Sequence, residues 1–309
     1  MKLVHREDFL AFSVLSMAFV ARRFPGVRQR FADGLALMAY AFSRQKRAAM
    51  ERALDAAFGA RLTASQKKAV VLGSLRSVWE ELFGLVAGAG ARSEFDNCEI
   101  RGIEHLRASQ SRGRGTILWE STGFGTRWMP KRLLEELGFR LLQVHASNHA
   151  GGFPSGDKEG SRLRGALLRP LVDRLEGYFL SELFFLRHDG SLSNLRELER
   201  RLRQNGLISV AADGVHGQRH LPLAVAGGTL RFPTGMVNLA RLTGADLLPL
   251  FGVRRAEGGF ALMIEAPIQM EDAGGRGAQV EGALAQYCQS LESYILRYPE
   301  QYRNWHILV

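Results

Sequence analysis

Cysteine is scarce in this sequence, and no known metal-binding spacing is present. The chain has 309 residues but only two cysteines, Cys98 and Cys288, which lie outside any CxxC or Cys/His pattern. Neither a disulfide framework nor a zinc site is therefore indicated, and no metal ion or other cofactor is expected. Few cysteines are typical of a protein from a reducing compartment.

Long apolar runs are also missing. The longest run near the N-terminus, Phe9–Ala21, has 13 residues, whereas a membrane-spanning helix needs roughly 20. Glu7 and Asp8 precede this run and no small-residue cleavage site follows it, so a signal peptide is not predicted. Two alternatives stay open for it: a helix on a membrane surface, or a helix packed on the protein's own core. We expect a cytoplasmic protein, with peripheral contact to the inner face of the cell membrane as a possible addition.

Basic residues are in surplus. The 41 Lys and Arg residues exceed the 31 Asp and Glu residues, which gives a formal net charge of +10. This surplus favours an anionic partner, such as an anionic membrane or an acidic carrier protein. Nucleic acid is not predicted, because the basic residues fall on predicted helices without exposed aromatic residues or groove-reading motifs between them. The arginines between residues 162 and 203 could bind phosphates or could form a solvated helix face.

The order of predicted elements indicates an α/β fold with a mixed, mainly parallel sheet flanked by helices. Residues 8–90 have helical periodicity, and short apolar strands alternate with helices after residue 94. We expect a helical N-terminal region, residues 1–90, packed on an α/β core, residues 91–309, as one structural domain. The predicted strands are Phe95–Ile100, Thr116–Trp119, Phe139–Val144, Leu183–Leu186, Leu207–Ala212, Asp246–Val253 and Phe260–Glu265.

The stretch from Gly115 to Arg132 is where chemistry is first expected. A buried strand there ends at Glu120, a polar and Gly-rich loop follows, and a helix begins near Trp128. Ligands of open α/β sheets bind at the carboxyl ends of the strands. Glu120 could be a base made stronger by burial, or a structural carboxylate that caps a helix or pairs with Arg127 or Arg132.

Several sequence blocks occur in a recognisable order. They are Arg52–Phe58, Ile100–Leu106 before Gly113–Gly115, Gly206 leading to Asp213, Leu239–Ala245 followed by Pro249–Phe251, and Tyr298–Trp305. In this pattern the chain resembles the lipid A biosynthesis acyltransferases, the lauroyl and myristoyl transferases of the lysophospholipid acyltransferase superfamily, over residues 45–308. The resemblance implies a membrane-associated enzyme that moves an acyl group from acyl carrier protein, or from an acyl-CoA donor, to an acceptor on a lipid or sugar.

The chain departs from that family at the expected catalytic loop. The family uses a His followed five positions later by Asp or Glu, in which the His takes the proton of the acceptor and the acid orients the imidazole. Aligning Phe124 and Gly125 with the family's Phe-Gly pair places Gly123 at the His position and Trp128 at the acid position. Shifting the alignment by one residue in either direction does not restore the pair.

Three interpretations follow. The protein is an acyltransferase with another base, for which an amine acceptor would need less help than a hydroxyl; or it does other chemistry on an acyl substrate; or it is inactive and binds an acyl chain, a lipid or acyl carrier protein. Glu120→Gln tests the first, and should remove most turnover at a nearly unchanged melting temperature. The candidate catalytic residues are Glu120, Ser121 and Thr122, and the candidate substrate-binding residues are Gly123, Arg127, His145, His149, Arg164, Asp213 and His216.

Overall fold

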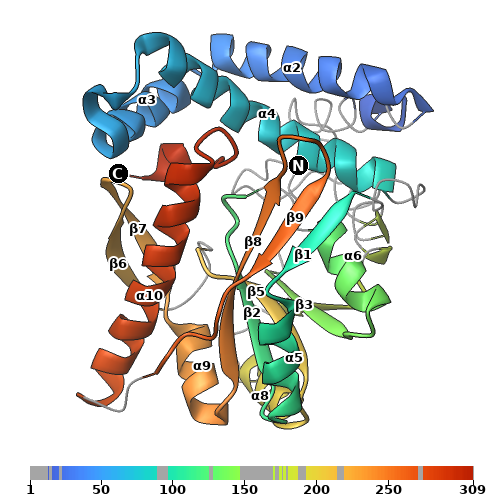
Figure 1. Ribbon diagram of the computed structural model, residues 1–309, viewed down its shortest axis with the longest axis vertical. Helices are drawn as coiled ribbons and strands as arrows, with labels where there is room; N and C mark the ends of the chain where they lie inside the picture. The colour runs from blue at the N-terminus through green and yellow to red at the C-terminus, as the bar shows by residue number, and fades with distance from the viewer. Residues whose placement is uncertain are drawn as a thin grey trace, which may run out of the picture.

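A seven-stranded sheet forms the centre of the computed structural model (Figure 1). The strand order is β1-β9-β8-β2-β5-β3-β4. All neighbouring strands are parallel except β8 and β9, so β9 and β1 run opposite to the other five strands. This confirms the predicted mixed, mainly parallel sheet. The strands are β1 Cys98–Arg101, β2 Thr116–Glu120, β3 Leu141–Ala146, β4 Glu182–Leu186, β5 Leu207–Ala211, β8 Asp246–Arg254 and β9 Phe260–Ile264.

The structure describes most of the chain, and the statements below concern that part. The described residues are 13, 16–20, 23–88, 97–124, 128–146, 170, 174–175, 177–178, 180–186, 193–213, 219–270 and 274–308. Residues 145–160 have no periodic pattern and are rich in Gly, Ser, Asn and Asp, which predicts a long loop, and Leu163–Leu175 predicts a helix. Both lie largely outside the described residues. The first two residues of that loop, His145 and Ala146, are the end of β3, which corrects the predicted loop boundary.

Strand β2 lies in the middle of the sheet, between β8 and β5. All five of its side chains are buried, as expected for a parallel strand covered on both faces. The predicted strand-helix-strand unit from β2 to β3 does contain two parallel strands, but β5 lies between them. Sequence order did not show this, because a strand from later in the chain can occupy the space between two earlier ones.

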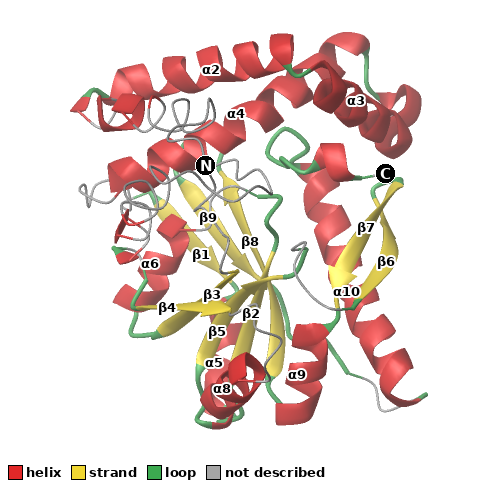
Figure 2. Cartoon of the chain, turned by 180° about the vertical axis from the view of Figure 1, so that it is seen from behind, coloured by secondary structure: helices red, strands yellow, loops and turns green. Residues whose placement is uncertain are grey.

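Helices cover both faces of the sheet (Figure 2). On one face, α8 (Ser193–Arg203), α9 (Gly235–Thr243) and α10 (Gly275–Arg297) bury their apolar residues in one cluster that includes Trp119 of β2. On the other face, α5 (Ile103–Ser111) and α6 (Trp128–Glu136) contribute to a second cluster that includes Leu118. Adjacent residues of β2 thus point to opposite layers, as the two-residue period of a strand requires.

The N-terminal region is helical, as predicted, throughout its described part. It contains α2 (Pro25–Phe42), α3 (Arg44–Phe58), the short 3₁₀ helix η1 (Gly59–Arg61) and α4 (Ala64–Gly88). Thr63 and Gln66 form a reciprocal capping box at the start of α4: the backbone N–H of each donates to the side chain of the other, at 2.8 and 3.3 Å. Figures 1 and 2 place these helices together at one end of the molecule, with α2 outermost.

A two-stranded hairpin, β6 (His220–Val225) and β7 (Gly228–Pro233), was not predicted. Its prolines, Pro222 and Pro233, argue against strands in a sequence, yet they are tolerated in a two-stranded edge. The turn at Ala226 and Gly227 has positive φ values of 48° and 75°. The hairpin lies beside α10 in both views, on the side of the molecule opposite α6 (Figures 1 and 2).

The C-terminal helix and the segment after it complete the fold. The sequence predicts a helix over Gln279–Tyr298 that ends before Pro299, and helix α10 begins one turn earlier, at Gly275. A short 3₁₀ helix, η4 (Trp305–Ile307), packs against α3. None of the helices in the described ranges combines the length and the apolarity that crossing a bilayer requires.

Candidate active site

The carboxyl ends of β2 and β5 lie side by side and each carries an acid. Glu120, the last residue of β2, is paired with Ala211 of β5, and the backbone N–H of Ala212 donates to the Glu120 carbonyl oxygen at 2.7 Å. Asp213 follows immediately. Both acids are almost fully buried, with 2% and 5% of their surface exposed. The predicted location of the site, at the carboxyl edge of the parallel strands, therefore contains two buried carboxylates.

Glu120 belongs to a cluster on the α6 face of the sheet. Its Oε2 atom lies 2.5 Å from the ammonium nitrogen of Lys131, which has no exposed surface. The Gln143 amide of β3 donates to Glu120 Oε1 at 2.9 Å, and its carbonyl oxygen accepts from the same Lys131 ammonium. The three side chains form a closed ring of contacts that connects β2, β3 and α6. We call Glu120, Lys131 and Gln143 the Glu120 cluster.

This arrangement identifies one ion-pair partner of Glu120. The structural alternative named Arg127 or Arg132; among the described residues Lys131 pairs with Glu120, whereas Arg132 pairs with Glu136 at 3.4 Å. Arg127 lies outside the described residues. Removing one member of a buried ion pair typically costs about 3–5 kcal/mol, because the other charge stays buried without compensation. Glu120→Gln should therefore lower the melting temperature, contrary to the expectation from sequence alone.

Asp213 is held by the loop that follows β2. The Ser121 hydroxyl donates to Asp213 Oδ2 at 2.7 Å, and the backbone N–H of Thr122 donates to Oδ1 at 2.6 Å. Ser121 also accepts from the backbone N–H of Gly123 at 3.1 Å. The predicted catalytic residues Ser121 and Thr122 thus lie together with Asp213, and both use these contacts to order the loop.

Gly123, which aligns with the family's His, lies against an aromatic ring. A Cβ atom at this position would lie 2.0 Å from Cε2 of Tyr302, far inside van der Waals contact. Tyr302 is fully buried, so its ring cannot yield without repacking. With Tyr302 in place, a side chain of any kind at position 123 is excluded, which is a physical reason for glycine here.

Two buried phenols lie near Asp213, and the sequence did not reveal them. Tyr287 of α10 and Tyr302 are fully buried, and within the described residues neither hydroxyl has a hydrogen-bond partner. Burial raises the pKa of each phenol well above its ordinary value, and the nearby Asp213 charge raises each pKa further. Both phenols therefore stay protonated and can act only as hydrogen-bond donors or neutral acceptors. We call Asp213, Ser121, Tyr287 and Tyr302 the Asp213 cluster.

Comparison with known proteins identifies the family. The sequence model of a family described as bacterial lipid A biosynthesis acyltransferase matches residues 1–307. The chain belongs to this family. No curated protein gave a match. The predicted family is thereby confirmed, and membership supports a general acyltransferase function.

Of the remaining predicted substrate-binding residues of this lipid A acyltransferase family member, the structure describes only His145. His145 lies in β3, not in a loop, and is buried beside Phe185, with 5.7 Å between ring centroids. It projects from the same face of β3 as Gln143, two residues earlier, and so toward the layer of the Glu120 cluster. His149, Arg164 and His216, like Arg127, lie outside the described residues.

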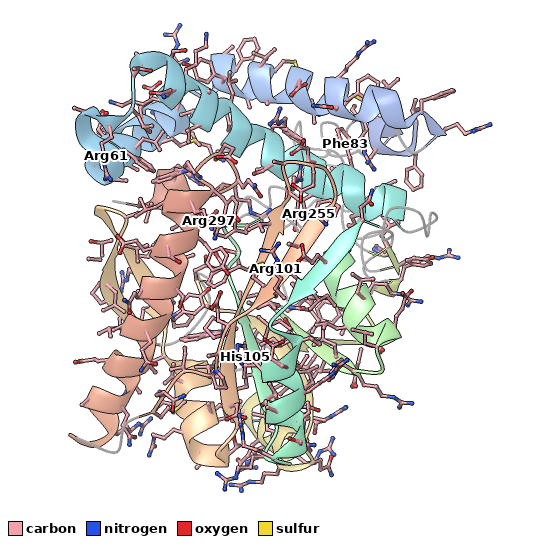
Figure 3. All side chains as sticks on the ribbon, in the orientation of Figure 1. Arg61, Phe83, Arg101, His105, Arg255 and Arg297 are labelled. Atoms are coloured by element: carbon pink, nitrogen blue, oxygen red, sulfur yellow. The ribbon has the colours of Figure 1, made fainter. Side chains whose placement is uncertain are left out.

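The arginines of α8 are largely neutralised by ion pairs. Arg200 pairs with Glu197 at 2.5 Å, and Arg201 pairs with both Glu197 and Glu182. Elsewhere, Arg101 and Arg255, labelled in Figure 3, each pair with an acid close by in sequence, Glu99 and Glu257. This pattern favours the solvated helix face over a phosphate-binding site for α8.

Proposed function

We propose that the protein transfers an acyl group from a carrier-protein or coenzyme A thioester to an amine or hydroxyl acceptor, through a non-standard active site at the ends of β2 and β5. Membership of the lipid A acyltransferase family supports acyl transfer in general. The observation that carries the location is the pair of buried acids, Glu120 and Asp213, that follow neighbouring parallel strands. In this proposal the acyl C–S bond breaks, a C–N or C–O bond forms, and the acceptor's proton leaves with a base.

Glu120 is the proposed base. The Lys131 ammonium lies 2.5 Å from one of its carboxylate oxygens, so part of this group is already used in an ion pair. An amine acceptor is the stronger nucleophile and needs less deprotonation during attack than a hydroxyl. We therefore propose an amine among the two acceptor classes. Asp213, held by Ser121 and Thr122, is proposed to orient the acceptor through its charge.

The alternative is an inactive or repurposed fold that binds an acyl chain, a lipid or acyl carrier protein. The observation that favours it is the contact between Gly123 and Tyr302, which leaves no space for the family's His, together with the Lys131 contact of Glu120. In that case the clusters at the strand ends only stabilise the fold, and binding would persist without turnover.

Thiol release and product mass distinguish the two functions. The full chain is incubated with acyl carrier protein and coenzyme A thioesters of several chain lengths, each with amine and hydroxyl acceptors. We expect free thiol and an acylated product, with faster reaction for amines. Absence of transfer and of thioester cleavage over the whole panel, with retained thioester binding in native mass spectrometry, would establish the binding alternative.

We also propose peripheral contact with an anionic membrane through α2. Six of the eleven exposed large apolar residues in the described part of the chain fall within residues 19–42. Phe42 is 84% exposed, and Met38, one helical turn earlier, is 53% exposed. Arg28, Arg30 and Arg44 lie on or beside the same helix. Exposed apolar residues beside basic residues are typical of a helix that lies in the headgroup region.

Vesicle sedimentation tests the membrane contact. We expect the full chain to sediment with vesicles that contain phosphatidylglycerol and to bind more weakly to purely zwitterionic vesicles or at high salt. Replacing Met38 and Phe42 with Glu should reduce binding at least tenfold, whereas the same change at Leu242, exposed on α9, should leave it intact. Equal binding by both double and control variants would contradict the role of α2.

A further inference from the structure

The segment after α10 closes on residues 121–124, the loop after β2 that holds Asp213. Tyr302 and Phe124 form an isolated antiparallel bridge, and the backbone N–H of Arg303 donates to the Gly123 carbonyl oxygen at 2.8 Å. The loop and this segment are about 180 residues apart in sequence. Their contact is therefore a product of the tertiary fold and was invisible in the sequence.

The Arg303 side chain bridges the loop and the N-terminal helices. Its Nε donates to the Thr122 carbonyl oxygen at 2.6 Å, and its Nη1 pairs with the Glu81 carboxylate of α4. The Arg303 side chain is 13% exposed and that of Glu81 is 6% exposed. A planar guanidinium can bind two acceptors at fixed angles, which a lysine ammonium on its flexible stem does less well.

All three polar groups of Thr122 are bound by distant residues. Asp213 accepts from its N–H, Arg303 donates to its carbonyl oxygen, and the Asn304 side-chain amide donates to its hydroxyl at 3.0 Å. An ordinary turn satisfies its polar groups by local contacts. Partners from two other parts of the chain indicate that the position of Thr122 is set by the tertiary structure.

The same segment is anchored to α4 at a second point. The Ser74 hydroxyl donates to the Tyr302 carbonyl oxygen at 2.8 Å. Ser74 and Glu81 lie two helical turns apart on α4 and so face the same way. One side of α4 therefore holds residues 302 and 303, which in turn hold the loop after β2.

We propose that Arg303 is a positioning residue for the reaction. It fixes the Thr122 peptide from the carbonyl side while Asp213 fixes it from the N–H side, so that Ser121 and Asp213 keep a defined geometry. The kinetic part of this inference rests on the proposed acyl transfer, whereas the structural part, the ordering of residues 121–124 by Arg303, does not. A misplacement of about 1 Å at a reacting group can reduce turnover on the order of 100-fold.

Hydrogen exchange tests the ordering without any need for activity. In Arg303→Met, we expect exchange in the peptide covering residues 121–124 to accelerate at least tenfold, while peptides from the middle of α10 keep their rates. Arg303→Lys should give an intermediate rate, because it keeps one of the two contacts. Arg297→Met is the matched control: Arg297 is exposed at the end of α10 (Figure 3) and should leave the loop unchanged.

Kinetics then test the role in the reaction. We expect Arg303→Met to reduce kcat about 10- to 100-fold with less than a threefold change in KM, and Arg303→Lys to recover part of the loss. Unchanged loop exchange, uniform acceleration over the whole chain, or an effect on KM alone would each overturn the inference; if Arg303→Met does not fold, Arg303→Lys decides. If the wild-type protein shows no turnover while Arg303→Met still accelerates exchange over residues 121–124, the proposed function is contradicted and the ordering of the loop by Arg303 is supported.

Discussion

The two acids at the ends of β2 and β5 are both buried but have different partners. Glu120 contacts a buried cation and an amide, Lys131 and Gln143, which complete a closed ring. Asp213 accepts from a hydroxyl and a backbone N–H, and within the described residues no ion pair involves it. Because only one of the two buried acids is in an ion pair within the described residues, burial alone does not identify a functional carboxylate. The charge of Glu120 is already compensated, whereas the charge of Asp213 can act on a bound group.

The strongest test of this comparison is to break the Glu120 cluster. Glu120→Gln and Lys131→Met should each lower the free energy of unfolding by about 3–5 kcal/mol, because each leaves one buried group without its charged partner. The double variant should recover most of the loss, since it removes both charges. Urea unfolding followed by circular dichroism measures this.

Turnover of the double variant then decides the chemical role of Glu120. A folded double variant without turnover supports Glu120 as the base, and full turnover excludes it. A change below about 0.5 kcal/mol for Glu120→Gln alone would contradict the buried ion pair, since only exposed substitutions are usually that mild.

Removing the charge of Asp213 should affect turnover more than stability. Asp213→Asn weakens two hydrogen bonds to a charged acceptor, worth about 1.5–3 kcal/mol each, although the amide oxygen keeps one of them. We expect at least a tenfold loss of kcat. Asp246→Asn is the matched control: Asp246 also accepts from a serine, Ser109 at 2.6 Å, but lies at the opposite end of the sheet. Equal kinetic effects of the two variants would contradict a special role for Asp213.

The contact between Gly123 and Tyr302 can be tested by adding one methyl group. Gly123→Ala should destabilise the protein by about 1–3 kcal/mol, because its Cβ atom overlaps the Tyr302 ring. A double-mutant cycle with Tyr302→Ala should show coupling between the two positions. Gly34→Ala in α2, where the new Cβ atom has open space, should be neutral or slightly stabilising. Additive effects at 123 and 302 would show that the ring is not the obstacle.

The two phenols should give the smallest effect on stability. Tyr287→Phe and Tyr302→Phe remove hydroxyls without a partner in the described structure, so the cost near pH 7 should be below about 1 kcal/mol. Because burial raises the pKa of both phenols, the unfolded chain loses these protons first as the pH rises above about 10. The Phe variants should therefore resist alkaline unfolding better than the wild type, as measured by circular dichroism. Unchanged alkaline stability would contradict the raised pKa values.

Much of the fold followed from local patterns. The apolar run Thr116–Trp119 predicted β2, and the helical spacing of apolar residues predicted α3 and α4, because one face of each element must be buried whatever the rest of the chain does. The β6–β7 hairpin was missed because its prolines oppose strand formation locally, while packing beside α10 stabilises it. The insertion of β5 between β2 and β3 was likewise decided by tertiary packing.

The candidate site was predictable in place but only partly in composition. The family blocks and the end of a buried strand pointed to Glu120, Ser121 and Asp213, and the structure brings these ends together. Lys131 and Tyr287 were not among the predicted site residues. No sequence signal links either to the acids, since Lys131 lies 11 positions from Glu120 and Tyr287 lies 74 positions from Asp213, and such contacts depend on how the chain packs.

The sequence by itself determined the family, the alternation of strands and helices, and the loop after β2 as the place where chemistry is expected. Tertiary structure alone decided which acid is compensated by an ion pair, because the partner of a buried charge is the residue that the fold brings beside it. It also placed Tyr302 beside Gly123 and Arg303 beside Thr122. Periodicity depends on residues that are close in sequence, whereas the environment of a buried charge depends on segments that meet only when the chain is folded.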